Sequence, residues 1–191
     1  MLQVSKLIPQ GQGLAPVLVR RAAHLELDWD VRQKSRFDTV ASDGRHVGVF
    51  LPRGAVVRGG DVLITQDGSL LRVVAAPQTV LKITACTAHD HGHVHDASFD
   101  LMRAAYHLGN RHVPIELQPD HLKIEPDHVL ADLLRAMHLT VTEVREPFEP
   151  EGGAYASHGG SPTGGHAHGA HGHNHDHTPH GTSHGHAHAH G

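Results

Sequence analysis

The stretch that decides the fold is DHVLADLLRAM at residues 127–137, followed by LTVTEV at residues 139–144. Asp127 is a residue type that caps helices, because its carboxylate accepts hydrogen bonds from the first free backbone N–H groups. After it, apolar residues recur at i, i+3, i+4 and i+7, the spacing of a helix with one buried face: Leu130, Leu133, Leu134 and Met137. We therefore predict a helix capped by Asp127 and a strand directly after it.

The residues before this helix continue the alternation of strands and helices. VPIEL (113–117) and HLKIE (121–125) are two strands joined by Gln118-Pro119-Asp120. Before them a helix with one apolar face should end at Gly109-Asn110; that face carries Ala97, Leu101, Ala104 and Leu108. TVLKITA (79–85) is a further strand. The order β-α-β-β-α-β is the pattern of ferredoxin-like domains, and we assign it to residues 77–150.

Residues 1–76 have a different character, since short β-rich runs alternate with turns between residues 24 and 75. The runs are LELDW (25–29), VGVFL (47–51), DVLI (61–64) and LLRVV (70–74). The turns between them contain Ser42-Asp43-Gly44, Arg58-Gly59-Gly60 and Gln66-Asp67-Gly68. No segment with a helical period interrupts them, so we predict a small β-barrel or sandwich. The chain is expected to be an α+β protein.

The composition changes again near residue 150. Residues 151–191 contain no Lys, Arg, Leu, Ile or Val, and they hold 12 of the 23 His residues. Such a segment cannot bury enough apolar surface to offset the entropy lost on ordering. We predict a disordered, flexible tail over residues 151–191.

Closely spaced histidines between small residues make this tail a candidate metal-binding array. Imidazole suits Ni(II), Cu(II) and Zn(II), and the tail alone does not choose among them. The alternatives to metal binding are a purification tag or a low-complexity tail that only keeps the chain solvated, but a tag is normally an unbroken run of His. The candidate ligands of the tail are His166, His168, His171, His173, His175, His177, His184, His186, His188 and His190.

A second cluster, HDHGHVHD at residues 89–96, lies between a predicted strand and a predicted helix. It resembles the H-x-H-x-D-H motif of zinc-dependent metallo-β-lactamase-type hydrolases, but His93 stands in the place of the Asp and Val94 in the place of the next His. A zinc hydrolase is therefore the weaker alternative. We interpret the segment as a surface loop that binds metal loosely through His89, His91, His93 and His95, or as a polar connector.

Composition and motifs exclude several classes of protein. The net charge is −4 and no Lys/Arg run offers a phosphate-binding stripe, so a nucleic-acid partner is not expected. Cys86 is the only cysteine, which precludes an intramolecular disulfide, and no apolar run approaches the roughly 20 residues of a membrane span. No P-loop, nucleophile–base pair or carboxylate dyad occurs. We expect a non-enzymatic cytoplasmic protein.

RAAYHLGNRHVP at residues 103–114 is the most specific segment of the chain. It closely resembles the central motif of the urease accessory protein UreE family, whose members are nickel metallochaperones. The resemblance runs in order through most of residues 24–155: WDVRQKSRF (29–37), SDGRHVGVFLPRGAVVRGGDVL (42–63), DHVLADLLRAMHLTVTEVREPFEPEGGAY (127–155) and then the His-rich tail. The GNRH and PFEPEGGAY segments are its most specific parts.

The resemblance implies an N-terminal peptide-binding-like domain, and a ferredoxin-like domain that binds metal and forms a homodimer. It implies that His112, the His of GNRH, binds Ni(II) at the two-fold axis together with its counterpart. Of an H-x-H pair seen in some members only His128 is present here. His107 matches a common family His, and is either a supporting residue or an exposed helix position.

The implied function is capture of Ni(II) and its donation during maturation of the urease active site. The implied partners are the urease accessory GTPase UreG and the complex of urease apoprotein with its accessory proteins. Cu(II) and Zn(II) are expected to bind in vitro. A His-rich buffer or storage protein for divalent metals, with no client protein, is the alternative from another class.

Overall fold

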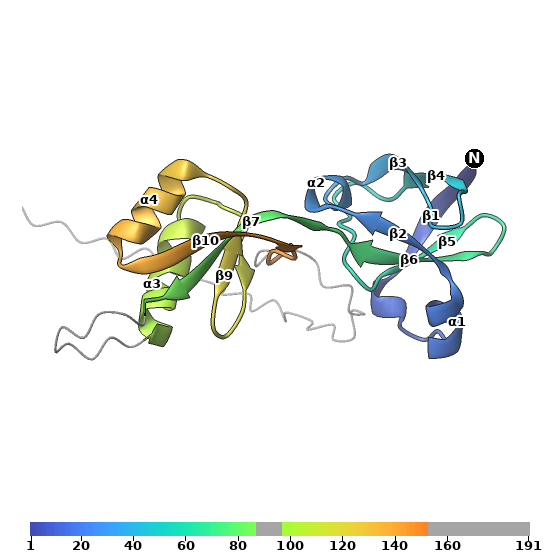
Figure 1. Ribbon diagram of the computed structural model, residues 1–191. Coiled ribbons are helices and arrows are strands. Elements are labelled where there is room, and N and C mark those ends of the chain that lie inside the picture. The colour runs from blue at the N-terminus through green and yellow to red at the C-terminus, as the bar shows by residue number, and fades with distance from the viewer. Residues whose placement is uncertain (87–96, 153–191) are drawn as a thin grey trace, which may run out of the picture. The chain divides into compact units, whose positions relative to one another are not determined.

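Two separate β-sheets form the part of the chain that the structure describes, residues 1–86 and 97–152 (Figure 1). The structure is a computed structural model of the 191-residue chain. Strands between residues 2 and 75 form the first sheet, and strands between residues 77 and 147 form the second. The prediction of an α+β chain, with a β-rich domain before a ferredoxin-like one, is confirmed. The predicted tail lies outside the described residues from position 153 onward.

The first sheet has six strands in the order β2-β6-β5-β1-β4-β3. Its two edge strands approach each other at one end, because the backbone N of Ser42 donates to the O of His24 at 2.9 Å. The sheet is thereby a nearly closed barrel around buried aliphatic side chains. Its elements are β1 Leu2–Ile8, the 3-10 turn Pro9–Gly11, α1 Pro16–Arg21, β2 Ala23–Leu27, α2 Trp29–Arg32, β3 Arg36–Val40, β4 His46–Phe50, β5 Val62–Thr65 and β6 Leu70–Ala75.

Strand β1 is the main feature of this domain that the sequence pattern did not indicate. It pairs in parallel with β4 and antiparallel with β5, which places it inside the sheet. Only Val4 of this strand is fully buried, so the alternation of apolar and polar residues is weak. The four-residue helix α2, which follows β2, is a second element that the sequence pattern did not indicate.

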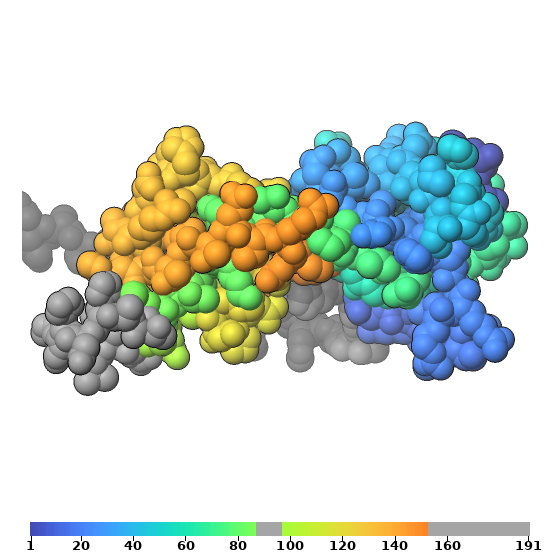
Figure 2. Space-filling model, viewed as in Figure 1, coloured from blue at the N-terminus to red at the C-terminus, as the bar shows by residue number. Residues whose placement is uncertain are grey.

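The second sheet has four strands in the order β10-β7-β9-β8. The strands β7 and β8, which α3 connects, have β9 between them, and the strands β9 and β10, which α4 connects, have β7 between them. This is the split arrangement expected of the predicted β-α-β-β-α-β order. Figure 2 shows α4 and β10 as adjoining parts of this domain's surface. The elements are β7 Pro77–Ala85, α3 Ala97–Gly109, β8 Glu116–Leu117, β9 Leu122–Ile124, α4 His128–Ala136 and β10 Leu139–Pro147.

The core of this domain lies between the two helices and one face of the sheet. Leu108 of α3 and Leu134 of α4 are fully buried and pack with Ile83 and Ile124 of the sheet. The predicted cap of α4 is present, because the Asp127 carboxylate accepts hydrogen bonds from the N of Val129 at 2.8 Å and of Leu130 at 3.0 Å. No helix among the described residues is long and apolar enough to cross a membrane.

Candidate metal centre around His112

His112 lies in the tight turn that follows α3. The helix ends at Gly109 as predicted, and the N of His112 then donates to the O of Gly109 at 2.9 Å. The backbone of His112 has φ 57°, in the left-handed region that residues other than glycine enter at a cost of about 1–2 kcal/mol. Its side chain is exposed. The turn therefore presents an imidazole to solvent at a fixed point of the chain.

The strand after His112 is shorter than the sequence predicts. It was expected to begin at Val113, but β8 spans only Glu116–Leu117. Pro114 has no backbone N–H that could donate a hydrogen bond to a neighbouring strand. The backbone O of Ile115 accepts a hydrogen bond from the backbone N of Glu151, which does not belong to a strand. Three residues thus separate His112 from the sheet.

His107 and His128 occupy helix ends. His107 is half-buried in the last turn of α3, where its ring meets that of Tyr106 edge-on with 5.4 Å between the ring centroids. His128 is the first residue of α4 and is exposed. A metal role for either residue stays a prediction.

The other predicted ligands fall outside the described residues. These are His89, His91, His93 and His95 of the 89–96 segment and all ten candidate residues of the tail, His166 to His190. Within residues 1–86 and 97–152, no three His, Cys, Asp or Glu side chains come together as a metal site. Any metal held at His112 must therefore take further ligands from elsewhere.

An exposed apolar stripe on α3 is a feature that the sequence analysis missed. Met102 is 62% exposed and Tyr106 is 66% exposed, although both belong to the helix that leads to His112. They stand four positions apart and share one side of the helix, whereas Leu101, Ala104 and Leu108 face the core. The i, i+4 spacing of a second apolar face was available in the sequence.

Comparison with known protein families gives a direct match for both domains. The model of the N-terminal domain of UreE urease accessory proteins matches residues 4–76, and the model of their C-terminal domain matches residues 78–190. The chain belongs to the UreE family. The junction between the two matches coincides with the change from the first sheet, which ends at Ala75, to the second, which starts at Pro77.

Individual UreE proteins are similar over most of their length. The urease accessory protein UreE of Albidiferax ferrireducens is 72% identical over 168 residues, which are 88% of this chain and 90% of the relative. That of Polaromonas naphthalenivorans is 71% identical over 88% of this chain and 75% of its own length. That of Ralstonia nicotianae is 49% identical over 88% and 72%, respectively.

A buried charge cluster supports β8 and β9 in this UreE family member, and the sequence analysis missed it. The Nζ of Lys123 lies 3.1 Å from Oε1 of Glu116 and 3.0 Å from Oε2 of Glu146, and it donates to the O of Pro147 at 3.1 Å. Burial disfavours the ammonium, but the hydrogen bonds to the two carboxylates outweigh it and raise the pKa of Lys123. The hydrogen bond from Lys123 lowers the pKa of Glu146. The cluster joins β8, β9 and β10.

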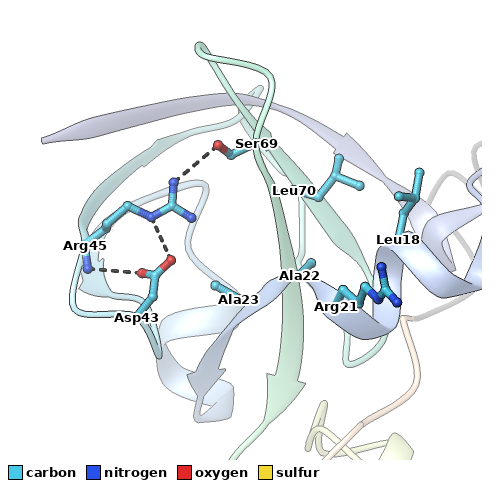
Figure 3. Close-up of a pocket in the computed structure, with 8 residues that line it drawn as sticks. All are labelled: Leu18, Arg21, Ala22, Ala23, Asp43, Arg45, Ser69 and Leu70. Carbon is cyan, nitrogen blue, oxygen red and sulfur yellow. Dashed lines mark hydrogen bonds and ion pairs between the residues drawn. The ribbon is translucent and has the colours of Figure 1, made fainter.

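The N-terminal domain of this UreE family member has an open hollow beside α1 and β6 (Figure 3). Arg45 lies on one side of it and links Asp43 with Ser69, with Nε 2.8 Å from Oδ2 of Asp43 and Nη1 3.3 Å from Oγ of Ser69. No predicted metal ligand lines the hollow, whose walls are Leu18, Arg21, Ala22, Ala23, Asp43, Arg45, Ser69 and Leu70. The hollow therefore adds no residue to the predicted metal ligands.

Proposed function

We propose that this UreE family member is a nickel metallochaperone that captures Ni(II) and donates it during urease maturation. Membership of a family of urease accessory proteins is the observation that carries the proposal. The concentration of 23 His residues in 191 supports it from the chemistry of the chain itself. Imidazole ligands bind Ni(II) well and exchange readily, whereas a closed thiolate cage would hold the ion as a structural centre.

His112 is the residue that we assign to the ion destined for delivery. Its imidazole is exposed and its backbone is fixed by the turn after α3. One imidazole binds weakly, but a symmetric dimer brings two copies together at its axis without any further residue in the sequence. Water and histidines of the tail would complete the shell of the ion.

The apolar side of α3 is the surface that we assign to the homodimer contact. Met102 and Tyr106 expose large apolar side chains close in sequence to His112. Such side chains are enriched at protein interfaces, and a two-fold interface buries the same patch of both copies. Burial of this stripe would bring the two His112 turns towards one axis.

The remaining histidines would act in capture, and the accessory proteins in delivery. The tail and the 89–95 segment would collect Ni(II) through labile sites. Transfer would take place in a complex with the GTPase UreG and the urease apoprotein–accessory complex. Cu(II) and Zn(II) would compete in vitro, because imidazole does not exclude them.

The test is Ni(II) titration of the full chain with His112→Asn, since asparagine tolerates the left-handed backbone of this position. We expect loss of one tight site per two chains, while the weaker sites and the dimer mass stay unchanged. His46→Ala, at an exposed histidine of β4 outside every proposed site, is the matched control, and His107→Ala and His128→Ala test the two other predicted ligands. Tight binding that survives His112→Asn but fails in His107→Ala or His128→Ala would move the site to that residue.

A further inference from the structure

The two sheets are joined at two places, of which only one is covalent. Ala76 alone separates the last strand of the first sheet, which ends at Ala75, from the first strand of the second, which starts at Pro77. The other junction follows β10. Figure 1 shows the end of β10 running beside β7, where Pro147 pairs with Pro77. We call the next three residues, 148–150, the strap.

Phe148 attaches the strap by apolar packing around Trp29 of the N-terminal domain. Its side chain is fully buried and meets the ring of Trp29 edge-on, with 6.2 Å between the ring centroids. Val80 of β7 belongs to the same cluster. The backbone N of Trp29 donates to Oε1 of Gln78 in the same strand at 2.8 Å. Trp29 therefore contacts side chains of the second sheet on either side of Ala76 in the fold.

Glu149 is the centre of the polar contacts between the strap and the N-terminal domain. Its Oε1 lies 2.8 Å from Nη1 of Arg32 and accepts a second bond from the N of Gly59 at 2.8 Å. Its Oε2 lies 3.4 Å from Nη1 of Arg58. Hydrogen bonds between ionised partners are stronger than neutral ones, so this carboxylate contributes most of the polar attachment.

Arg32 and Arg58 also bind the backbone of the strap. Arg32 donates from Nη2 to the O of Phe148 at 2.5 Å, and Arg58 donates from Nη1 to the O of Pro150 at 2.5 Å. Both guanidinium groups lie over the ring of Trp29, at 5.4 and 5.0 Å from its centroid. Two cations thus meet one carboxylate, and loss of its charge would leave the fully buried Arg32 without a charged partner.

The strap is attached separately to the C-terminal domain by its backbone. The N of Glu149 donates to Oε2 of Glu116 at 2.7 Å, and the N of Glu151 donates to the O of Ile115 at 2.8 Å. None of these bonds involves the N-terminal domain. The side chain of Glu149 can therefore leave the arginines while the backbone of the strap keeps its place.

The closed position of the strap carries costs of its own. Nε1 of Trp29 is buried without a hydrogen-bond partner among the described residues, which disfavours burial of the indole. Burial raises the pKa of Asp61 and the charge of Glu149 raises it further, so the two carboxylates repel each other. Glu149 is 32% exposed, and water can therefore replace its donors. These costs lower the free energy that is needed to release the strap.

We propose that the strap is a latch, which frees the N-terminal domain to turn about Ala76 when Glu149 leaves its two arginines, while both sheets stay folded. In the closed position the strap holds the two domains together. In the open position it stays on the C-terminal domain through its backbone bonds, and both guanidinium groups gain water in place of the carboxylate. The latch involves no metal ligand, so it stands or falls independently of the proposed function.

The experiment measures amide hydrogen exchange of the full chain by NMR, because exchange reports openings that fall short of global unfolding. The amides of Gly59 and Trp29 donate to side chains beyond Ala76 and report release of the strap. The amide of Glu151 donates within the C-terminal domain and reports unfolding of the strap itself. Amides inside β4 and β7 report unfolding of the two sheets.

Three variants change the latch or leave it intact. Glu149→Gln removes the charge and keeps the shape. Glu143→Gln is the matched control, because it makes the same change at an exposed carboxylate of β10. Gly59→Ala opens the latch from the other side, since a Cβ at this position would lie 2.7 Å from Oε1 of Glu149. The amide of Trp29 is the readout for this variant.

In the unaltered chain, the amides of Gly59 and Trp29 should exchange at one common rate, faster than those of β4 and β7. Glu149→Gln should speed both about tenfold to a hundredfold, the effect of losing a hydrogen bond to a charged group. The amide of Glu151 should not change. Gly59→Ala should speed the Trp29 amide in the unaltered chain, but add nothing to Glu149→Ala, in which no carboxylate remains to be displaced. Glu143→Gln should match the unaltered chain.

Three outcomes would overturn the latch. If the amides of Gly59 and Trp29 exchange as slowly as those of β4 and β7, the strap opens only with global unfolding. If Glu149→Gln leaves them unchanged or speeds only one of them, Glu149 does not control a common opening. If Glu149→Gln speeds the amides of Glu151 and of both sheets equally, the strap is needed for folding and is not a latch. Should Glu149→Ala fail to fold, Glu149→Gln and Gly59→Ala decide.

Discussion

Nη1 of Arg32 lies 2.8 Å from Oε1 of Glu149, across 117 positions of the sequence. The arginine belongs to the short helix α2 of the N-terminal domain, and the carboxylate follows the last strand of the C-terminal domain. Because Arg32 is fully buried, its guanidinium depends on partners in the segment that follows β10, far from it in sequence. The two domains are therefore expected to depend on each other for stability.

Arg32→Lys should lower the free energy of unfolding by about 2 kcal/mol, because a lysine keeps the charge but cannot reach the three acceptors of the guanidinium. These acceptors are the O of Leu27, the O of Phe148 and Glu149. Urea denaturation measures the change. Lys34→Ala, which breaks an exposed ion pair with Asp30, should cost about 0.5 kcal/mol or less. Equal losses in the two variants would contradict the expectation.

Lys123→Met should destabilise the chain by about 3 kcal/mol, since it leaves the buried carboxylate of Glu116 without its cation. Adding Glu116→Gln removes that charge, so the double variant should lose less than the sum of the two single variants. Chemical denaturation of the four proteins completes the cycle. Additive losses would show that the two side chains do not depend on each other.

Asp61 should make stability fall with rising pH. Burial raises its pKa above the ordinary value of 3.8, and the nearby Glu149 adds to this effect. The native state then binds more protons than the unfolded state from about pH 3.8 up to the raised pKa, so the unfolding free energy decreases across this window. The stability difference between the unaltered chain and Asp61→Asn should shrink as pH rises through it. A difference that grows with pH would contradict the assigned direction.

Removal of the residues after Tyr155 should leave a folded dimer with fewer Ni(II) sites. One tight site per two chains should remain, because His112 is retained while the tail histidines are lost. Calorimetric titration gives the stoichiometry and light scattering the mass. The division between capture and delivery fails if no tight site survives the truncation.

Replacement of His89, His91, His93 and His95 by Ala in this shortened chain should lower Ni(II) capacity further and leave the tight site unchanged. The expectation rests on the spacing of four imidazoles within seven residues. Counting bound Ni(II) after gel filtration is the measurement. An unchanged count would mean that the segment is only a polar connector.

Local sequence signals were sufficient for much of the C-terminal domain. Asp127 caps α4, and the buried positions of α3 and α4 follow the helical spacing, because both helices present a single apolar face to a sheet. The N-terminal strand β1 was not predicted from the spacing of its apolar residues. Its interior position comes from pairing with β4 and β5, which are distant in sequence, and not from its own alternation.

For the candidate site too, local sequence signals predicted some features and the tertiary structure decided the others. The sequence by itself determined that His112 stands after a helix stop and that histidines crowd the tail, since helix ends and ligand types are local properties. Only the tertiary structure decided that His112 adopts a left-handed backbone, that β8 begins three residues later than expected, and that Glu149 meets Arg32. These depend on contacts between segments that come together only when the chain folds, and a buried charge takes whichever partner the fold brings within reach.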